Sequence, residues 1–175
     1  MKIKILIPVY NDFQSVSKLI SKINFTISNI SHEFSIIIVN DNSTENAEID
    51  INNIDKISSI KIIEIKKNQG HARCIATGLK YILDKEQFDY VIPMDGDGED
   101  RPEEIAKFIE FLKYDQIKPI IGERVKRSEG LIFKIFYSIH KLITYIFTGQ
   151  SIKFGNFTCL PKSTVEKMVS EKATW

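Results

Sequence analysis

The stretch Phe88-Asp89-Tyr90-Val91-Ile92-Pro93-Met94-Asp95-Gly96-Asp97-Gly98-Glu99 decides the fold class of this 175-residue chain. Its first seven residues are mostly apolar and predict a buried strand. Asp95 and Asp97 follow directly. Alternate residues of an extended backbone point the same way, so these two carboxylates, with Glu99 as a third, can converge on one point. The glycines between them, Gly96 and Gly98, leave room for a bulky ligand to approach the backbone. Oxygen ligands of this kind suit a hard divalent cation that also holds phosphates.

An acidic turn in solvent is the alternative interpretation of so short a motif taken alone. The sequence that follows favours a site. Arg101-Pro102-Glu103-Glu104-Ile105 predicts the start of a helix, with proline in the first turn and acids favoured by the helix dipole. A strand that leads through a polar turn into a helix is the repeating unit of an α/β protein.

Strand and helix patterns alternate along the rest of the chain. Strands are predicted at residues 3–8, 34–40, 60–65, 88–94, 117–121 and 152–160. Apolar side chains recur at helical spacing within residues 16–27, 75–83, 105–112, 131–147 and 163–169. Such alternation implies right-handed βαβ units, and the length suits one domain. We therefore expect a single α/β domain over residues 1–175, with a mostly parallel central sheet flanked by helices.

Polar clusters follow the carboxyl ends of five predicted strands. Because parallel strands bring these ends to one edge of the sheet, where α/β proteins bind ligands, the clusters predict a site at that edge. The clusters are Tyr10-Asn11-Asp12, Asp41-Asn42-Ser43, Asn68-Gln69-Gly70, Asp95-Gly96-Asp97 and Glu123-Arg124.

Composition excludes several other classes. A formal net charge of +1 gives no reason to expect nucleic-acid binding. The distant cysteines Cys74 and Cys159 form neither a disulfide framework nor a zinc pattern and fit a reducing cytosol. The apolar segment 131–147 is interrupted by Lys134, His140 and Lys141 and is too short for a membrane span. It predicts a helix that packs on the sheet, or one that also makes peripheral contact with a membrane.

Four motifs, in order along the chain, resemble those of the inverting glycosyltransferases of family 2, which have the Rossmann-like GT-A fold. Ile7-Pro8-Val9-Tyr10-Asn11-Asp12 is similar to the opening P-x-Y-N-[ED] loop, and Val39-Asn40-Asp41-Asn42-Ser43 to V-[ND]-D-x-S. Asn68-Gln69-Gly70-His71-Ala72-Arg73, followed by Gly78, is similar to N-x-G-x-x-x-A-x-x-x-G. Asp95-Gly96-Asp97 corresponds to the D-x-D motif. The resemblance covers roughly the first two thirds of the chain.

Within the family, the chain is most similar to the dolichyl- and polyprenyl-phosphate sugar synthases. That branch has x-Q-x-P-P-E after the D-x-D motif and G-S-R after the next strand. The corresponding residues here are Gly98-Glu99-Asp100-Arg101-Pro102-Glu103 and Gly122-Glu123-Arg124. Glu99, a competent hard ligand, takes the place of the glutamine that helps to hold the metal.

The resemblance implies roles for individual residues. It implies Mg²⁺ or Mn²⁺ as cofactor, held by Asp95, Asp97 and Glu99, and it makes Asp97 and Arg124 the catalytic residues, with Lys134 as a looser match. Three alternatives stay open. Asp41 also fits an Asx turn or helix cap, Arg73 also fits a surface ion pair, and His71 fits a local hydrogen-bond partner. The nucleotide-binding residues implied are Pro8, Tyr10, Asn11, Asp41, Gly70, Arg73, Asp95 and Gly96.

The resemblance also implies the reaction, which is transfer of a sugar from a nucleoside-diphosphate sugar, with UDP favoured, to a lipid-phosphate or glycan acceptor. This suits cell-envelope polysaccharide synthesis, in the cytoplasm or at the inner face of the cytoplasmic membrane. No general base is identified, and we expect the chain to be truncated at its C-terminus, without the acceptor-side segment. A non-catalytic nucleotide-binding module and a receiver-like signalling domain are the alternative functions.

Overall fold

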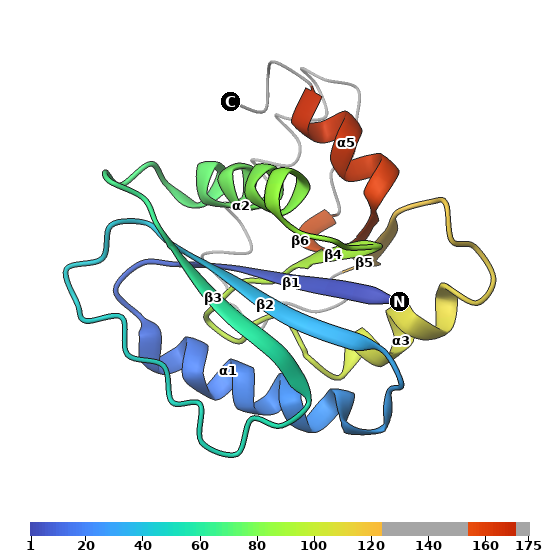
Figure 1. Ribbon diagram of the computed structural model, residues 1–175, viewed down its shortest axis with the longest axis horizontal. Helices are drawn as coiled ribbons and strands as arrows, with labels where there is room; N and C mark the ends of the chain where they lie inside the picture. The colour runs from blue at the N-terminus through green and yellow to red at the C-terminus, as the bar shows by residue number, and fades with distance from the viewer. Residues whose placement is uncertain (124–153, 171–175) are drawn as a thin grey trace, which may run out of the picture. The chain divides into compact units, whose positions relative to one another are not determined.

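Six strands and four α-helices make up the part of the computed structural model that is described, residues 1–123 and 154–170 (Figure 1). The strands are β1 (Lys2–Val9), β2 (Glu33–Asn40), β3 (Ile57–Glu64), β4 (Tyr90–Pro93), β5 (Ile120–Glu123) and β6 (Phe154–Pro161). The helices are α1 (Phe13–Thr26), α2 (His71–Lys85), α3 (Glu104–Phe111) and α5 (Lys162–Ser170), and a 3₁₀ turn, η1 (Ile27–Asn29), follows α1. The helix predicted at 131–147 lies outside the described residues.

The strands form one sheet in the order β3-β2-β1-β4-β6-β5. β1 pairs in parallel with β2 and with β4, β2 pairs in parallel with β3, and β6 runs antiparallel to β4. This confirms the predicted α/β class and mostly parallel sheet. The order differs from the 2-1-3-4-5 order of receiver domains, so the topology does not support the receiver-like alternative.

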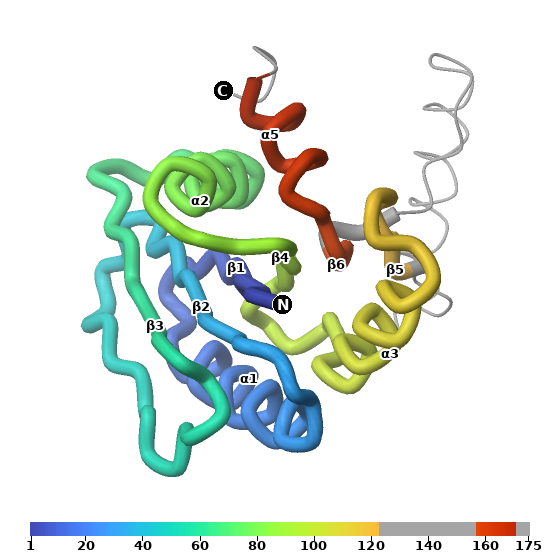
Figure 2. Tube along the Cα trace, turned by 45° about the vertical axis from the view of Figure 1, so that its right-hand side comes forward, coloured from blue at the N-terminus to red at the C-terminus, as the bar shows by residue number. Residues whose placement is uncertain are grey.

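Helices cover both faces of the sheet, as Figure 2 shows. Ile3, Ile5 and Ile7 of β1 pack in one apolar cluster with side chains of α1 and α3. Leu6, which points the other way, belongs to a second cluster with side chains of α2 and α5. Strands buried on both faces have nearly continuous apolar sequences. This is why β1 and β2 carry apolar runs rather than an alternating pattern.

Two predicted boundaries are wrong for local reasons. α3 begins at Glu104, so Pro102 precedes the helix instead of lying in its first turn. There the Pro102 carbonyl accepts from the Ile105 N–H (2.9 Å), which makes a turn ahead of the helix. The strand predicted at 117–121 begins only at Ile120, because the Asp115 carboxylate accepts from the N–H groups of the two residues at 117 and 118 and holds them in a turn.

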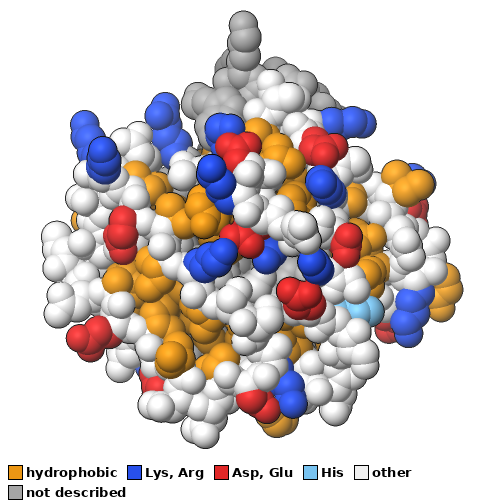
Figure 3. Space-filling view, viewed as in Figure 1, with side chains coloured by type: hydrophobic (Ala, Val, Ile, Leu, Met, Phe, Trp, Pro, Cys, Tyr) orange, Lys and Arg blue, Asp and Glu red, His pale blue; other side chains and the backbone are white. Residues whose placement is uncertain are grey.

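The chain divides into two compact units, one of residues 1–120 and 156–175 and one of residues 121–155. All of the site described below belongs to the first unit. None of the described helices has both the length and the apolar character needed to cross a bilayer. Both cysteines are buried and free. Acidic and basic side chains are interspersed over the face in view in Figure 3.

A buried ion-pair cluster joins the start of the sheet to the end of α2. The Glu86 carboxylate accepts from Lys4 Nζ of β1 (3.1 Å) and from Lys61 Nζ of β3 (2.6 Å). The Lys4 and Glu86 side chains are only 7% and 9% exposed, whereas that of Lys61 is 47% exposed. Burial alone raises the pKa of Glu86, but the hydrogen bonds from the two lysines outweigh it and hold that pKa below its ordinary value of 4.5.

We expect Glu86→Gln to lower the free energy of unfolding by about 3 kcal/mol near neutral pH, because it leaves the buried Lys4 ammonium without its counter-charge. The folded-state pKa of Glu86 is depressed, so its contribution is present above 4.5 and is lost as the pH falls through the folded value. Urea unfolding at a series of pH values should show the difference between wild type and variant shrinking towards acid.

Lys61→Met is the matched control and should cost much less stability, since the exposed Lys61 ammonium is screened by solvent. Equal losses for Glu86→Gln and Lys61→Met, or a difference that does not depend on pH, would contradict this account of the cluster.

Candidate functional site

A pocket of about 400 Å³ lies where β1 and β4 end side by side. The chain runs outward from β1 through β2 to β3 on one side and continues at β4 on the other, so the strand order reverses between β1 and β4. Ligands of open α/β sheets bind at such a reversal, beyond the carboxyl ends of the strands. The pocket is lined by Pro8, Val9, Tyr10, Asp12, Val16, His71, Asp95, Gly96 and Asp97.

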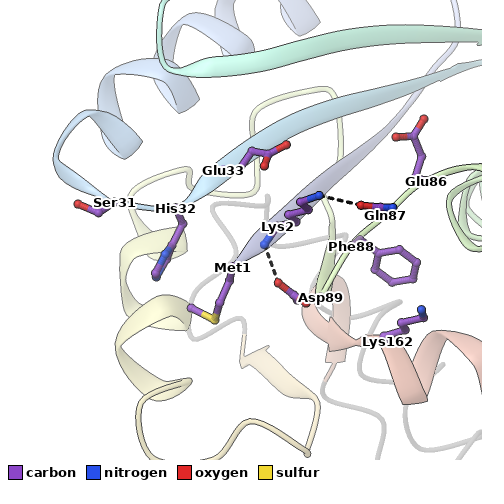
Figure 4. A pocket seen from close by; sticks show the side chains of 10 residues that line it. All are labelled: Met1, Lys2, Ser31, His32, Glu33, Glu86, Gln87, Phe88, Asp89 and Lys162. Carbon is purple, nitrogen blue, oxygen red and sulfur yellow. Dashed lines mark hydrogen bonds between the residues drawn. The ribbon is translucent and has the colours of Figure 1, made fainter.

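A larger and more open hollow, of about 910 Å³, lies at the amino ends of the strands (Figure 4). Several of its polar groups are paired with one another. The Lys2 backbone N–H donates to the Asp89 carboxylate (2.7 Å), and Lys2 Nζ donates to the Gln87 side-chain oxygen (2.9 Å). Because open α/β sheets bind ligands at the carboxyl ends of their strands, this hollow at the amino ends is the weaker candidate for a ligand site.

The acidic loop after β4 is held by its own side chains. Asp97 Oδ1 accepts from the Glu99 N–H (2.9 Å), and the buried Asp100 accepts from the Asp95 N–H (2.9 Å). Gly98 has a φ of +80°, which the loop needs and which other residues rarely adopt. Asp95 is partly buried and Asp97 is exposed, and both face the pocket.

Gly96 serves packing as well as access. A Cβ at this position would lie 3.1 Å from the Pro8 carbonyl oxygen and 3.1 Å from a methyl of Val16. The missing side chain therefore lets the acidic loop approach the end of β1 and the first turns of α1. From the sequence we expected Gly96 to leave room for a ligand. In the structure it also packs against Pro8 and Val16.

His71, the first residue of α2, faces the acidic loop. Its Nε2 lies 3.3 Å from Asp95 Oδ1, and the imidazole is about half exposed at the wall of the pocket. Gly70, immediately before it, has a φ of +85° and open space where a Cβ would stand. The first N–H groups of a helix lack intrahelical acceptors and favour anions. The start of α2 thus supplies an anion-attracting wall beside the two acids.

Asp41, at the end of β2, holds the backbone of the turn that leads into α2. One carboxylate oxygen accepts from the Gln69 N–H (2.7 Å) and the other from the Gly70 N–H (2.8 Å), and the side chain is buried. Burial and the adjacent Asp41 carboxylate raise the pKa of the Cys74 thiol to about 12. In this structure Asp41 therefore acts on the pocket through the backbone it positions.

Asn11 ties the loop after β1 to the loop after β2. Its N–H donates to Ser43 Oγ (2.8 Å), and its side-chain oxygen accepts from the Thr44 N–H (2.7 Å). Asn11 and Asn42 have φ values of +51° and +60°, in the left-handed region that asparagine tolerates better than most residues. Both loops turn sharply at the sheet edge for this reason.

The structure brings five of the predicted residues around the pocket, and these are Pro8, Tyr10, Asp95, Gly96 and Asp97. Arg73 is exposed and donates to Gln69 (3.4 Å). The Glu99 side chain is exposed and does not line the pocket, and the described residues contain no group of three His, Cys, Asp or Glu side chains arranged to bind a metal. Arg124 and Lys134 lie outside the described residues.

Sequence reasoning did not single out Asp100 or Val16. Asp100 is 4% exposed and closes the acidic loop, and Val16 forms part of the pocket wall from α1. From the sequence alone, an acid in an acidic stretch is expected to face solvent. Only its burial in the structure distinguishes Asp100 from the neighbouring acids Asp97 and Glu99. Val16 belongs to the helical pattern of α1, and that pattern does not say which core residue reaches a pocket.

We expect Asp41→Ala to loosen the turn before α2, because the N–H groups of Gln69 and Gly70 lose the buried carboxylate that accepts from them. The free energy of unfolding should fall by about 2–3 kcal/mol. The local readout is cysteine alkylation at about pH 8, mapped by mass spectrometry. Cys74 should react faster in the variant, while Cys159, which is buried elsewhere and also has a pKa of about 12, should not.

Asp41→Asn is the matched control, since its amide oxygen can still accept from one of the two N–H groups. A Cys74 that stays as unreactive in Asp41→Ala as in wild type would show that the turn does not depend on Asp41.

Comparison with known proteins identifies a family for the chain. The sequence profile of glycosyl transferase family 2 matches residues 4–165. The chain is 26% identical over 162 residues to the undecaprenyl-phosphate 4-deoxy-4-formamido-L-arabinose transferase of Salmonella choleraesuis, covering 91% of this chain and 47% of that protein. It is 22% identical over 136 residues to the dodecaprenyl-phosphate galacturonate synthase of Rhizobium johnstonii, covering 77% and 39%. The chain thus spans less than half the length of these two relatives.

Solved structures show the same fold. A mannosyltransferase from Pyrobaculum calidifontis in complex with GDP-Man and Mn²⁺ has a TM-score of 0.60 at 14% identity, covering 95% of this chain and 46% of that one. Glucosyl-3-phosphoglycerate synthase from Mycobacterium tuberculosis has a TM-score of 0.64 at 12% identity, covering 93% and 57%. This similarity concerns the fold alone and confirms the GT-A architecture. Because the family profile spans nearly the whole chain, the protein belongs to glycosyltransferase family 2.

Proposed function

We propose that this chain is the donor-binding part of a metal-dependent, inverting glycosyltransferase that takes its sugar from a nucleoside-diphosphate sugar. The observation that carries the proposal is the pocket between the ends of β1 and β4. It has Asp95 and Asp97 on one wall, the start of α2 on another and the exposed Tyr10 ring on a third. Acids beside an anion-attracting helix start fit a ligand that combines phosphates with a divalent cation.

The donor set fits Mg²⁺ or Mn²⁺ bound together with the diphosphate. Mg²⁺ is usually held in proteins by one or two carboxylates, with substrate phosphates and water completing its shell. Asp95 and Asp97 supply two such carboxylates, and Glu99 stands two residues further along the same loop. When bound, the cation neutralises the charge that builds up on the departing diphosphate.

The remaining residues would bind and orient the donor. We assign the nucleoside side of the pocket to Pro8 and Tyr10, with Asn11 and Asp41 holding the loops around it. Gly70 and the exposed Arg73, at the start of α2, would face the diphosphate. Arg124 keeps its proposed role of adding positive charge to the leaving group.

The acceptor we propose is a polyprenyl phosphate at the cytoplasmic face of the membrane, because both curated relatives are named for such lipids. Its phosphate oxygen would attack the anomeric carbon from the side opposite the diphosphate. A new carbon–oxygen bond forms, the bond to the diphosphate breaks with its electron pair, and the configuration inverts. A phosphate is already anionic at neutral pH, so this step needs no general base.

We expect UDP to bind in the presence of Mn²⁺ and to bind far more weakly without it, because the two acids repel an uncompensated diphosphate. Calorimetric titration with UDP, and with GDP in parallel, measures this directly. Asp95→Ala or Asp97→Ala should weaken the metal-dependent binding at least about tenfold, because each removes a proposed metal ligand.

The control is Asp84→Ala, which removes a carboxylate of α2 that pairs only at the surface with Lys80 (2.7 Å). If neither nucleotide binds with Mn²⁺ present, or if Asp84→Ala matches the two loop variants, the donor-site assignment fails.

Tyr10→Ala should lower UDP affinity roughly tenfold without changing its dependence on Mn²⁺, because the 53%-exposed ring offers a stacking surface for the base. Tyr10→Phe should bind as wild type does, because it keeps the ring. Titration of UDP at fixed Mn²⁺, and of Mn²⁺ at fixed UDP, separates the two effects. A loss in Tyr10→Phe equal to that in Tyr10→Ala would assign the contact to the hydroxyl instead.

A further inference from the structure

Asp100 is a charged side chain buried at the end of the acidic loop. It is 4% exposed, although it follows three consecutive exposed residues. A buried carboxylate costs free energy unless hydrogen bonds compensate it. One such bond is its Oδ2 contact with the Asp95 N–H, at 2.9 Å. The burial of Asp100 against the backbone of Asp95 therefore suggests a role for Asp100 in holding the loop.

The contact with Asp95 lies directly after the backbone bonds that join the segment of β4 to β1. The Met94 N–H donates to the Leu6 carbonyl of β1 (2.9 Å) and is the last backbone donor that β1 accepts from this segment. The next N–H, that of Asp95, points away from β1, because successive N–H groups of an extended segment point to opposite sides, and it donates to Asp100 Oδ2. Asp100 therefore satisfies the first N–H beyond the strand, which belongs to the residue that carries the first pocket carboxylate.

The loop is fixed at two further points. Gly96 lies against the Pro8 carbonyl, whose oxygen would be only 3.1 Å from a Cβ, and Asp97 Oδ1 accepts from the Glu99 N–H. The bond between the Asp95 N–H and Asp100 is a third such point, at the residue that carries the first pocket carboxylate. Groups that orient metal ligands typically change metal affinity 10- to 100-fold when they are removed, an order-of-magnitude guide to what this bond is worth.

We propose that Asp100 is a positioning residue of the donor site, which closes the acidic loop through the Asp95 N–H so that the Asp95 and Asp97 carboxylates face one cation. This inference rests on the proposed function of the pocket. Asp100 itself does not line the pocket, and its bound oxygen points to the backbone, so it acts through Asp95 and not as a ligand.

The test compares Asp100→Ala and Asp100→Asn with Asp115→Ala. Asp115 is a matched control because its carboxylate also accepts from backbone N–H groups of a turn, those of Ile117 and Lys118, but away from the pocket. The first measurement is amide hydrogen exchange at Asp95 in the absence of metal. Asp100→Ala should expose this amide to exchange, whereas Asp100→Asn, which retains an acceptor oxygen, should keep it protected.

The second measurement is Mn²⁺ affinity at saturating UDP, by calorimetry and by the electron paramagnetic resonance signal of free Mn²⁺. Asp100→Ala should weaken Mn²⁺ binding about 10- to 100-fold, and Asp100→Asn and Asp115→Ala by less than about threefold. If Asp100→Ala does not fold, Asp100→Asn carries the test, because it must keep both the Asp95 protection and the Mn²⁺ affinity.

Three results would overturn the inference. A protected Asp95 amide in Asp100→Ala would show that the loop closes without Asp100. A protected amide with lost Mn²⁺ affinity in Asp100→Asn would make Asp100 a charged ligand, and unchanged Mn²⁺ affinity in Asp100→Ala would remove its role. Failure of the proposed function is a separate outcome, seen as the absence of Mn²⁺-dependent UDP binding by the wild-type chain.

Discussion

β1 is paired in parallel on both sides, with β2 and with β4, and this pairing is the constraint on which the site depends. Parallel neighbours end at the same edge, so the residues after β1, β2 and β4 meet there whatever their distance in sequence. The register aligns Leu6 with Pro93 and Val9 with Asn40, which brings the two exit loops and the acidic loop together. Burial of β1 on both faces makes the arrangement stable.

The edge is built from polar groups that act mainly on the backbone. Asn11 joins two loops, Asp41 holds the turn before α2, and Asp100 holds the first residue of the acidic loop. Such hydrogen bonds satisfy N–H groups that irregular backbone leaves without partners. The side chains left facing the pocket, chiefly Tyr10, Asp95 and Asp97, are thereby carried on a fixed frame. The proposed cation site requires such a frame, because small displacements of the ligands weaken binding.

The main buried ion-pair cluster and the candidate pocket lie in different parts of the sheet. The Lys4–Glu86–Lys61 cluster lies on the strands and on the end of α2, away from the pocket, and its charges are matched within the protein. At the opposite edge, the acids Asp95 and Asp97 gather on one wall of the pocket.

The sequence by itself determined the α/β class, the parallel core and the edge at which the candidate pocket lies. The reason is that apolar runs and turn residues act locally, and parallel pairing then fixes where their ends meet. Only the tertiary structure decided that Gly96 packs on Pro8, that Asp41 faces backbone amides and that Asp100 is buried. These facts depend on contacts between segments far apart in the chain or on how a loop folds back on itself. The sequence of a polar stretch does not show whether a carboxylate faces solvent, a cation or an N–H group. Only the surrounding fold distinguishes these three environments.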